Sequence, residues 1–298
     1  QKKALVSIMH ANNEIGVLQP IKEIGELCKK YNSIFHSDVA QSIGTQTIDV
    51  SDMNIDALSI SAHKIYGPKG IGALFISNSI KNTLRPLMSG GGQEMGLRSG
   101  TQSPALCVGL GEACKDISIN RDKYVQHFKE LKSALLSDLI TSKFEFNING
   151  SVEKRIPNNL NIQIVGKVAE QLFNFIPHIA LSSGSACSSG TIERSHVLTA
   201  MKLPDQRIDG SFRISFGREA TKDEIKELTL AFAKLPETFL HIPGVKGFYH
   251  LSKLRAAPEG MPVDNIPAAT FPSFQTVYRN SNLSYQVEVD NQDPRVEF

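Results

Sequence analysis

The chain has 298 residues, of which 41% are hydrophobic and 21% charged, and its formal net charge is +2. This composition is typical of a globular protein with a sizeable core, and the length predicts about two domains. Lysines and arginines form no basic block, so we expect neither direct nucleic-acid binding nor membrane attachment. No apolar run approaches the length of a membrane span. The chain lacks a starting Met and begins inside a strand-like stretch, so we expect its natural beginning to lie upstream.

The first part of the chain predicts alternating strands and helices. Apolar residues recur at helical spacing from Ile21 to Cys28, directly after Pro20, which suits the first turn of a helix. A longer helix is expected over residues 105–117, and strands are expected at residues 4–9, 33–37, 56–61 and 71–76. Strands separated by helices or loops indicate a mostly parallel sheet covered by helices. The fold class is therefore α/β.

A polar stretch at residues 120–121 marks the expected domain boundary, so the first domain is assigned to residues 1–118. The second domain, residues 119–236, is expected to contain helices at 123–139, 168–175 and 221–234 and strands at 144–147, 160–164, 179–181 and 212–216. Thr221 and Glu224 form a capping-box pattern for the last helix. Residues 237–298 form a tail of unknown function, irregular over 256–274 and with one short strand at 284–289.

The four cysteines show neither a CxxC pattern nor zinc-ligand spacing, so we expect no metal site and no disulfide framework. Cys28, Cys107 and Cys114 lie among apolar residues in helix-like stretches and are expected to be small core residues. Cys187 differs, because it lies in LSSGSACSSGT. The small polar neighbours predict an exposed, mobile loop and a reactive thiol.

Four polar segments follow predicted strands: HANNEIG (10–16), HSDVAQS (36–42), SAHK (61–64) and, further on, RSGT (98–101). In open α/β sheets, ligands bind at the carboxyl ends of the strands. A single lysine beside a turn is usually a solvated surface residue. The recurrence of such segments at several strand ends instead favours a binding site that includes Lys64.

These segments, together with GGGQEMGLRSGT, SSGSACSSG and FRISFGR, resemble cysteine desulfurases of the NifS/IscS type. That family belongs to the class-V aminotransferase group of pyridoxal-phosphate (PLP) enzymes of fold type I. The resemblance runs in family order from residue 3 to about residue 235. It implies part of a large PLP-binding domain followed by a smaller α+β domain. The upstream half of the family's large domain, with its phosphate loop and ring-stacking histidine, has no match here, and neither has the tail.

The resemblance implies roles for residues at the strand ends. Lys64 would hold PLP covalently and then move the substrate α-proton, as a lysine amine can do once desolvated. Asp38 would pair with the ring nitrogen and keep the ring an electron sink. Gln41 and Asn13 would hydrogen-bond the phenolic oxygen, and Asn13 would also contact the substrate.

The phosphate and the substrate carboxylate have their own implied partners. Ser61 and His63 would hold the phosphate, and Thr101 would contact the phosphate of a neighbouring subunit, which implies a homodimer. Arg213 would bind the α-carboxylate of L-cysteine, since a guanidinium binds a carboxylate through two hydrogen bonds. Arg218 is the nearby competitor for that task.

Cys187 would take the sulfur of L-cysteine, giving alanine and a persulfide. The expected acceptor is an iron–sulfur scaffold or a tRNA-thiolation relay protein. The expected location is cytoplasmic, or mitochondrial in a eukaryote. Two alternatives to a cysteine desulfurase remain. One is a related enzyme, a selenocysteine lyase or another class-V PLP enzyme. The other is a truncated, non-catalytic homologue. The joint presence of Lys64, Asp38, Gln41 and Cys187 argues against the non-catalytic reading.

Overall fold

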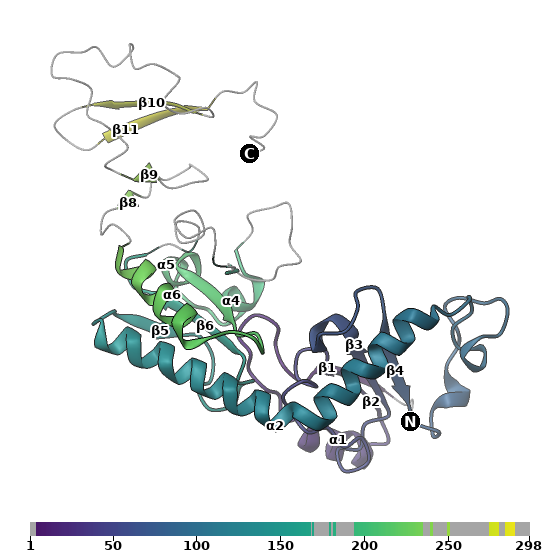
Figure 1. Cartoon of the computed structure of the whole chain (residues 1–298). Helices are drawn as coiled ribbons and strands as arrows, with labels where there is room; N and C mark the ends of the chain where they lie inside the picture. Colours follow the sequence, from purple (N-terminus) through teal and green to yellow (C-terminus); the bar gives the residue numbers. More distant parts are fainter. Residues whose placement is uncertain are drawn as a thin grey trace.

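The structure is a computed structural model that describes residues 4–167, 169, 179, 181–182 and 194–234, together with four short strands of the tail. The chain first forms a four-stranded sheet in the order β1 (Leu5–Met9), β2 (Ile34–Asp38), β3 (Ala57–Ser61) and β4 (Gly72–Ile76) (Figure 1). The first three strands run parallel, and β4 pairs antiparallel with β3. This confirms the predicted α/β class with a mostly parallel sheet.

One face of this sheet is covered and the other is open. Helix α1 (Ile21–Lys30) packs through Cys28 against Phe35 and Leu58, and these residues form part of a core on the first face. Because successive strand residues point to opposite faces, the alternate residues lie on the second face. There Leu5 is 68% exposed and Leu74 55% exposed. We call this second face the open face; it is marked by Leu5, Met9 and Leu74.

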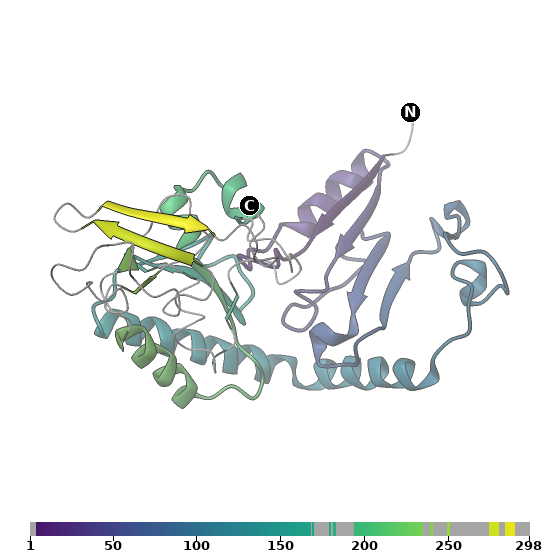
Figure 2. The same cartoon turned by 90° about the horizontal axis from the view of Figure 1, so that it is seen from above.

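Helix α2 (Pro104–Thr141) is a single helix of 38 residues, where the sequence predicted two helices separated near residue 120. The polar residues there lie within the helix, where Asn120 donates a side-chain hydrogen bond of 2.8 Å to Asp116, four residues earlier. Neither glycine nor proline occurs between residues 114 and 141. The helix therefore runs past both sheets of the protein (Figure 2).

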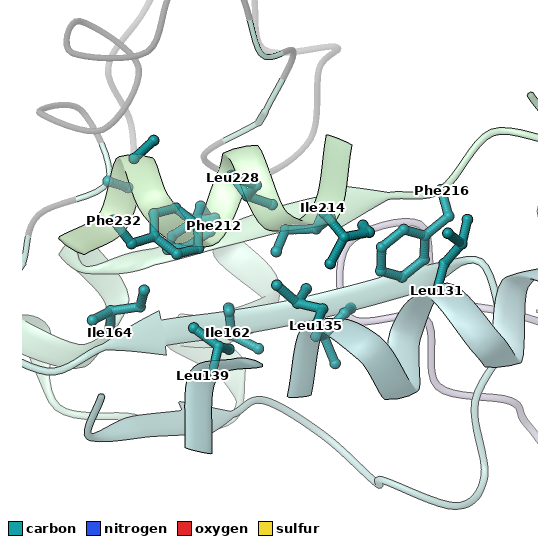
Figure 3. Packing of buried hydrophobic residues seen from close by; sticks show 14 of the residues in the cluster. Leu131, Leu135, Leu139, Ile162, Ile164, Phe212, Ile214, Phe216, Leu228 and Phe232 are labelled. Atoms are coloured by element: carbon teal, nitrogen blue, oxygen red, sulfur yellow. The ribbon is translucent and has the colours of Figure 1, made fainter. Parts of the chain in front are cut away.

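The second sheet is antiparallel, in the order β5 (Phe146–Ile148), β6 (Asn159–Ile164) and β7 (Ser211–Ser215). It packs against the second half of α2 and against α6 (Lys222–Lys234) (Figure 3). The core contains Leu131, Leu135, Leu139, Leu160, Ile162, Ile164, Phe212, Leu228 and Phe232, each at most 3% exposed. We call this part, from the second half of α2 to residue 234, the second region, and the preceding part the first region.

The capping box predicted for α6 is present. The backbone N–H of Thr221 donates to the Glu224 carboxylate at 2.7 Å, and the N–H of Glu224 donates to the Thr221 hydroxyl at 3.2 Å. Short elements complete the described chain: η1 (Ala62–Ile65), η2 (Lys81–Thr83), η3 (Glu94–Gly96), α4 (His196–Ala200) and α5 (Asp205–Asp209).

The tail contains β8 (Phe239–Leu240), β9 (Tyr249–His250), β10 (Phe274–Arg279) and β11 (Ser284–Val289). The strand expected at 284–289 is confirmed as β11, but its antiparallel partner β10 was not predicted. The helix expected at 168–175 and the loop around Cys187 lie outside the described residues.

The cysteine prediction is correct for one residue and wrong for two. Cys28 is buried under the first sheet, and burial raises the pKa of its thiol. Cys107 and Cys114 are exposed. They lie seven residues apart on one face of α2, which no element in the described part of the chain covers. Apolar neighbours in the sequence therefore did not imply burial.

Candidate active site

The ends of three strands meet at one edge of the first sheet. Met9 at the end of β1 pairs with Asp38 at the end of β2, and Asp38 pairs with Ser59 of β3. The segments 10–16, 36–42 and 61–64 therefore emerge side by side, where parallel sheets bind ligands. Asp38, Ser59 and Ser61 lie on the same face of the sheet, since side chains of a strand alternate with period two.

Asp38 is exposed at this edge and is held in place from its own turn. Its Oδ1 accepts a hydrogen bond of 2.8 Å from the backbone N–H of Ala40. Its carbonyl accepts a 2.8 Å hydrogen bond from the N–H of His10, which joins the loop after β1 to the end of β2. Gln41 follows in the same turn and is half-buried.

Lys64 lies in η1, the short turn that follows β3. Ala62 and Ile65 are buried and anchor the turn, whereas His63 and Lys64 are exposed. The Oγ of Ser61 lies 3.0 Å from Nδ1 of His63, so the two proposed phosphate ligands are neighbours. Ala62 and Ile65 are three residues apart and therefore lie on the same, buried side of this 3-10 turn, which leaves Lys64 on the exposed side.

Arg213 reaches the same edge from the second region. It is half-buried in β7, and its Nη1 donates a hydrogen bond of 2.8 Å to the carbonyl oxygen of Asn13. These residues are 200 positions apart in the chain. The structure therefore brings together the two residues that the sequence assigned to substrate binding.

Residues of the second region hold the loop after β1 in place by hydrogen bonds. The side-chain amides of Asn159 and Asn161 donate to the carbonyl of Glu14, at 3.4 and 3.2 Å. The carboxylate of Glu14 is 1% exposed and accepts a hydrogen bond from Ser195. Gly16 has φ +70°, and a Cβ there would lie 2.5 Å from Oδ1 of Asn159. A side chain at position 16 would therefore disturb the loop that carries Asn13.

Two buried basic residues beside this loop were not identified from the sequence. His10 is 7% exposed, and burial lowers its pKa. Arg155 is 5% exposed, and burial lowers its pKa to about 10. Its Nη2 donates to the carbonyl of Ile15 at 3.0 Å. No local pattern distinguishes these residues from surface ones. The contact of Arg155 with Ile15 joins two segments that are 140 positions apart in the chain.

Thr101 and Arg218 do not join this edge. Thr101 is exposed in the segment between β4 and α2, which projects away from the second region (Figure 2). Arg218 is engaged elsewhere, with Nη1 3.0 Å from a carboxylate oxygen of Asp116. This contact disfavours Arg218 as the competitor for the substrate carboxylate. Cys187 lies outside the described residues.

A cavity of about 380 Å³ lies away from these residues, at the amino ends of β2 and β3, and is lined among others by Ile34, Asp56 and Ser77. Within the described ranges, no group of His, Cys, Asp or Glu side chains is arranged to hold a metal ion. No helix in the same ranges is long and apolar enough to cross a membrane. The strand-end edge thus remains the candidate active site.

Comparison with known families agrees with this geometry. The family described as Aminotransferase class-V matches residues 1–228. The chain belongs to the class-V aminotransferase family. Enzymes of this family, NifS/IscS cysteine desulfurases included, depend on pyridoxal phosphate.

Two relatives within this family are cysteine desulfurases. The "Cysteine desulfurase IscS" of Vibrio vulnificus is 46% identical over 235 residues, which are 78% of this chain and 58% of the relative. The "Cysteine desulfurase, mitochondrial" of Saccharomyces cerevisiae is 47% identical over 221 residues, which are 74% of this chain and 44% of that protein. The chain thus spans about half the length of these class-V relatives.

Solved structures give the same picture. A "NifS-like protein" from Rickettsia africae superposes with a TM-score of 0.70 at 36% identity, covering 78% of this chain and 61% of that one. A second structure, titled "NIFS-LIKE PROTEIN", has a TM-score of 0.69 at 32% identity, covering 78% and 62%. These superpositions confirm the predicted fold of PLP enzymes of type I.

Proposed function

We propose that this chain is the lysine- and cysteine-bearing part of a PLP-dependent cysteine desulfurase, which converts L-cysteine to L-alanine and retains the sulfur on Cys187. The observation that carries the proposal is the meeting of Arg213 and Asn13 with the strand ends that bear Asp38 and Lys64. Together they offer an amine, a carboxylate and a guanidinium at one edge. The 46% identical cysteine desulfurase of Vibrio vulnificus supports the choice of reaction.

The residues at this edge fit pyridoxal phosphate. The carboxylate of Asp38, fixed by the N–H of Ala40, suits the protonated ring nitrogen. Ser61 and His63 are adjacent hydrogen-bonding groups for the phosphate. Gln41 and Asn13 are the proposed partners of the phenolic oxygen. When bound, the cofactor supplies an electron sink for the bonds that break at the substrate.

The remaining chemistry belongs to side chains of this chain. Arg213 binds the α-carboxylate of L-cysteine and orients the substrate toward Lys64, whose amine moves the α-proton. The thiolate of Cys187 attacks the substrate sulfur. A sulfur–sulfur bond forms, the carbon–sulfur bond breaks, and its electron pair stays with the carbon, which is then protonated to give alanine. The product on Cys187 is a persulfide.

The proposal extends to an assembly and to a location. Thr101 and the face of α2 that bears Cys107 and Cys114 are exposed, which suits a homodimer in which Thr101 reaches the partner's phosphate site. The persulfide would pass to an acceptor protein, an iron–sulfur scaffold or a tRNA-thiolation relay. The proposed location is the cytoplasm, or the mitochondrion in a eukaryote; the yeast relative is named as a mitochondrial protein.

We keep the proposed division into residues 1–118, 119–236 and 237–298. Two separate clusters on α2 support the boundary near residue 119: Ala113 and Ile117 pack with Ile65 of the first region, whereas Leu131 and Leu135 pack in the second. The family match ends at residue 228, close to the start of the tail.

The experiment compares the chain alone with a completed protein. The completed protein joins this chain to the part of the Vibrio vulnificus enzyme that precedes the matching region. We expect the chain alone to bind PLP poorly, because Leu5 and Leu74 are exposed on the open face and because no segment of this chain matches the phosphate loop of the family. The completed protein should bind PLP at close to one per chain and release alanine from L-cysteine.

The products decide between the alternatives. Alanine from selenocysteine but not from cysteine would favour a selenocysteine lyase. A completed protein that binds PLP and releases no alanine from either substrate would contradict the proposed function and favour a non-catalytic homologue.

A further inference from the structure

Four side chains outside the candidate site join η1, the middle of α2 and the end of β7: Tyr66, Asp116, Tyr124 and Arg218. Arg218 is their centre, with its guanidinium carbon 4.4 Å from the centroid of the Tyr66 ring and Nη1 3.0 Å from Oδ2 of Asp116. The backbone N–H of Arg218 also donates to the hydroxyl of Tyr66 at 3.0 Å. Arg218 therefore contacts the turn of Lys64 and the long helix at once.

Asp116 and Tyr124 fix the helix side of the cluster. The Tyr124 hydroxyl donates to both carboxylate oxygens of Asp116, at 3.1 and 3.0 Å. Hydrogen bonds from Asn120 and Tyr124, together with the charge of Arg218, lower the pKa of Asp116, which keeps the carboxylate ionised opposite the guanidinium. The ring of Tyr124 packs against the hydrophobic clusters of both regions. The cluster thus lies at the junction of the two regions.

Tyr66 has an unusual backbone. Its φ of 66° places it in the left-handed region, which bulky residues rarely adopt. Such a conformation costs free energy and persists where surrounding contacts hold it. The contacts of its ring and hydroxyl with Arg218 are contacts of this kind.

The cluster is close in sequence to two site residues. Tyr66 follows Lys64 by two residues, and Arg218 follows Arg213 by five. A link between Tyr66 and Arg218 therefore restrains the turn that carries Lys64 relative to the strand that carries Arg213.

We propose that Tyr66, Asp116, Tyr124 and Arg218 form a clasp that sets the position of Lys64 relative to Arg213, so that both meet the same substrate. They are positioning residues, and this role rests on the proposed function. The contacts of the clasp do not depend on catalytic activity, so the clasp and the proposed function can be tested separately.

The first test measures amide hydrogen exchange in the chain as it stands. Arg218→Met removes the ion pair and the cation over the ring. We expect exchange in residues 62–67 to rise by about fivefold or more, because a local opening becomes easier. Arg218→Lys, which keeps the cation, should restore most of the protection.

The matched control is Arg194→Met. Arg194 also pairs with two carboxylates, Asp205 at 2.6 Å and Asp209 at 2.8 Å, but both belong to the second region. This variant should leave exchange in residues 62–67 unchanged. Unchanged exchange in Arg218→Met, or an equal rise in both variants, would overturn the clasp.

The second test measures kcat and KM for L-cysteine in the completed protein. Arg218→Met should raise KM by roughly tenfold with a smaller change in kcat, because carboxylate binding is misaligned while PLP still binds Lys64. Arg218→Lys should recover most of the loss, and Arg194→Met should have no effect. An unchanged KM alongside raised exchange would overturn the positioning role. A parent protein that releases no alanine contradicts the proposed function instead, and hydrogen exchange still decides the clasp.

Discussion

The two regions of the molecule differ in how completely their sheets are covered. All six residues of β6 are buried, and the second sheet packs against α2 and α6. In β4 of the first sheet, four of five residues are exposed. The second region, which we call the closed region, contacts the loop of Asn13, whereas the first region, which we call the open region, carries Asp38 and Lys64. Chemistry and stability are therefore expected to respond to different substitutions.

The largest effect on activity is expected from Lys64→Ala. Without the amine, the completed protein should lose the visible absorbance of lysine-bound cofactor and all alanine release, because the proposed mechanism uses this amine both as nucleophile and as proton carrier. Its unfolding curve in urea should match that of the parent, since Lys64 is exposed. Lys69→Ala, in the same turn region, is the control and should remain active. Normal turnover by Lys64→Ala would contradict the assignment of Lys64 as the catalytic lysine.

Cys187→Ser should separate binding from sulfur transfer. The variant should bind PLP and L-cysteine like the parent, since these contacts involve the strand ends and Arg213, but release no sulfide because a hydroxyl cannot carry the sulfur. Sulfide release is measured with a reducing thiol present. Cys114→Ser removes an exposed thiol and is the matched control. Equal sulfide release by Cys187→Ser and the parent would make Cys187 an ordinary thiol.

Stability should depend more on the closed region. Leu135 is fully buried, so Leu135→Ala should lower the free energy of unfolding by about 3 kcal/mol through lost burial and a cavity. Leu74 is 55% exposed on the open face, and Leu74→Ala should change the free energy of unfolding by less than about 0.5 kcal/mol. Urea unfolding of the chain measures both values. Equal losses would show that the open face is covered in solution.

The smallest effect concerns the capping box of α6. Thr221→Ala removes the hydroxyl that accepts the N–H of Glu224 and should cost about 1 kcal/mol of unfolding free energy. Thr221→Ser keeps the hydroxyl and should behave like the parent in the same urea titration. A loss as large as that of Leu135→Ala would mean that α6 contributes more than its cap and core contacts explain.

Elements whose pattern is local could be predicted from the amino-acid sequence. The apolar runs of the first four strands, the helical spacing after Pro20 and the Thr221–Glu224 box are properties of neighbouring residues, and the structure contains these strands, the helix and the capping box. The polar segments after β1, β2 and β3 were predicted to converge because parallel strands present their carboxyl ends at one edge. The choice of Lys64 and Cys187 came from resemblance and remains a prediction about roles.

Contacts between distant segments could not be predicted from local patterns. The polar residues near position 120 looked like a break, but α2 continues through them and packs against the cores of both regions. Arg213 and Arg218 lie five residues apart in one motif, yet one contacts Asn13 and the other Asp116. Which partner each arginine reaches depends on residues 100 to 200 positions away, and no local period encodes such a contact.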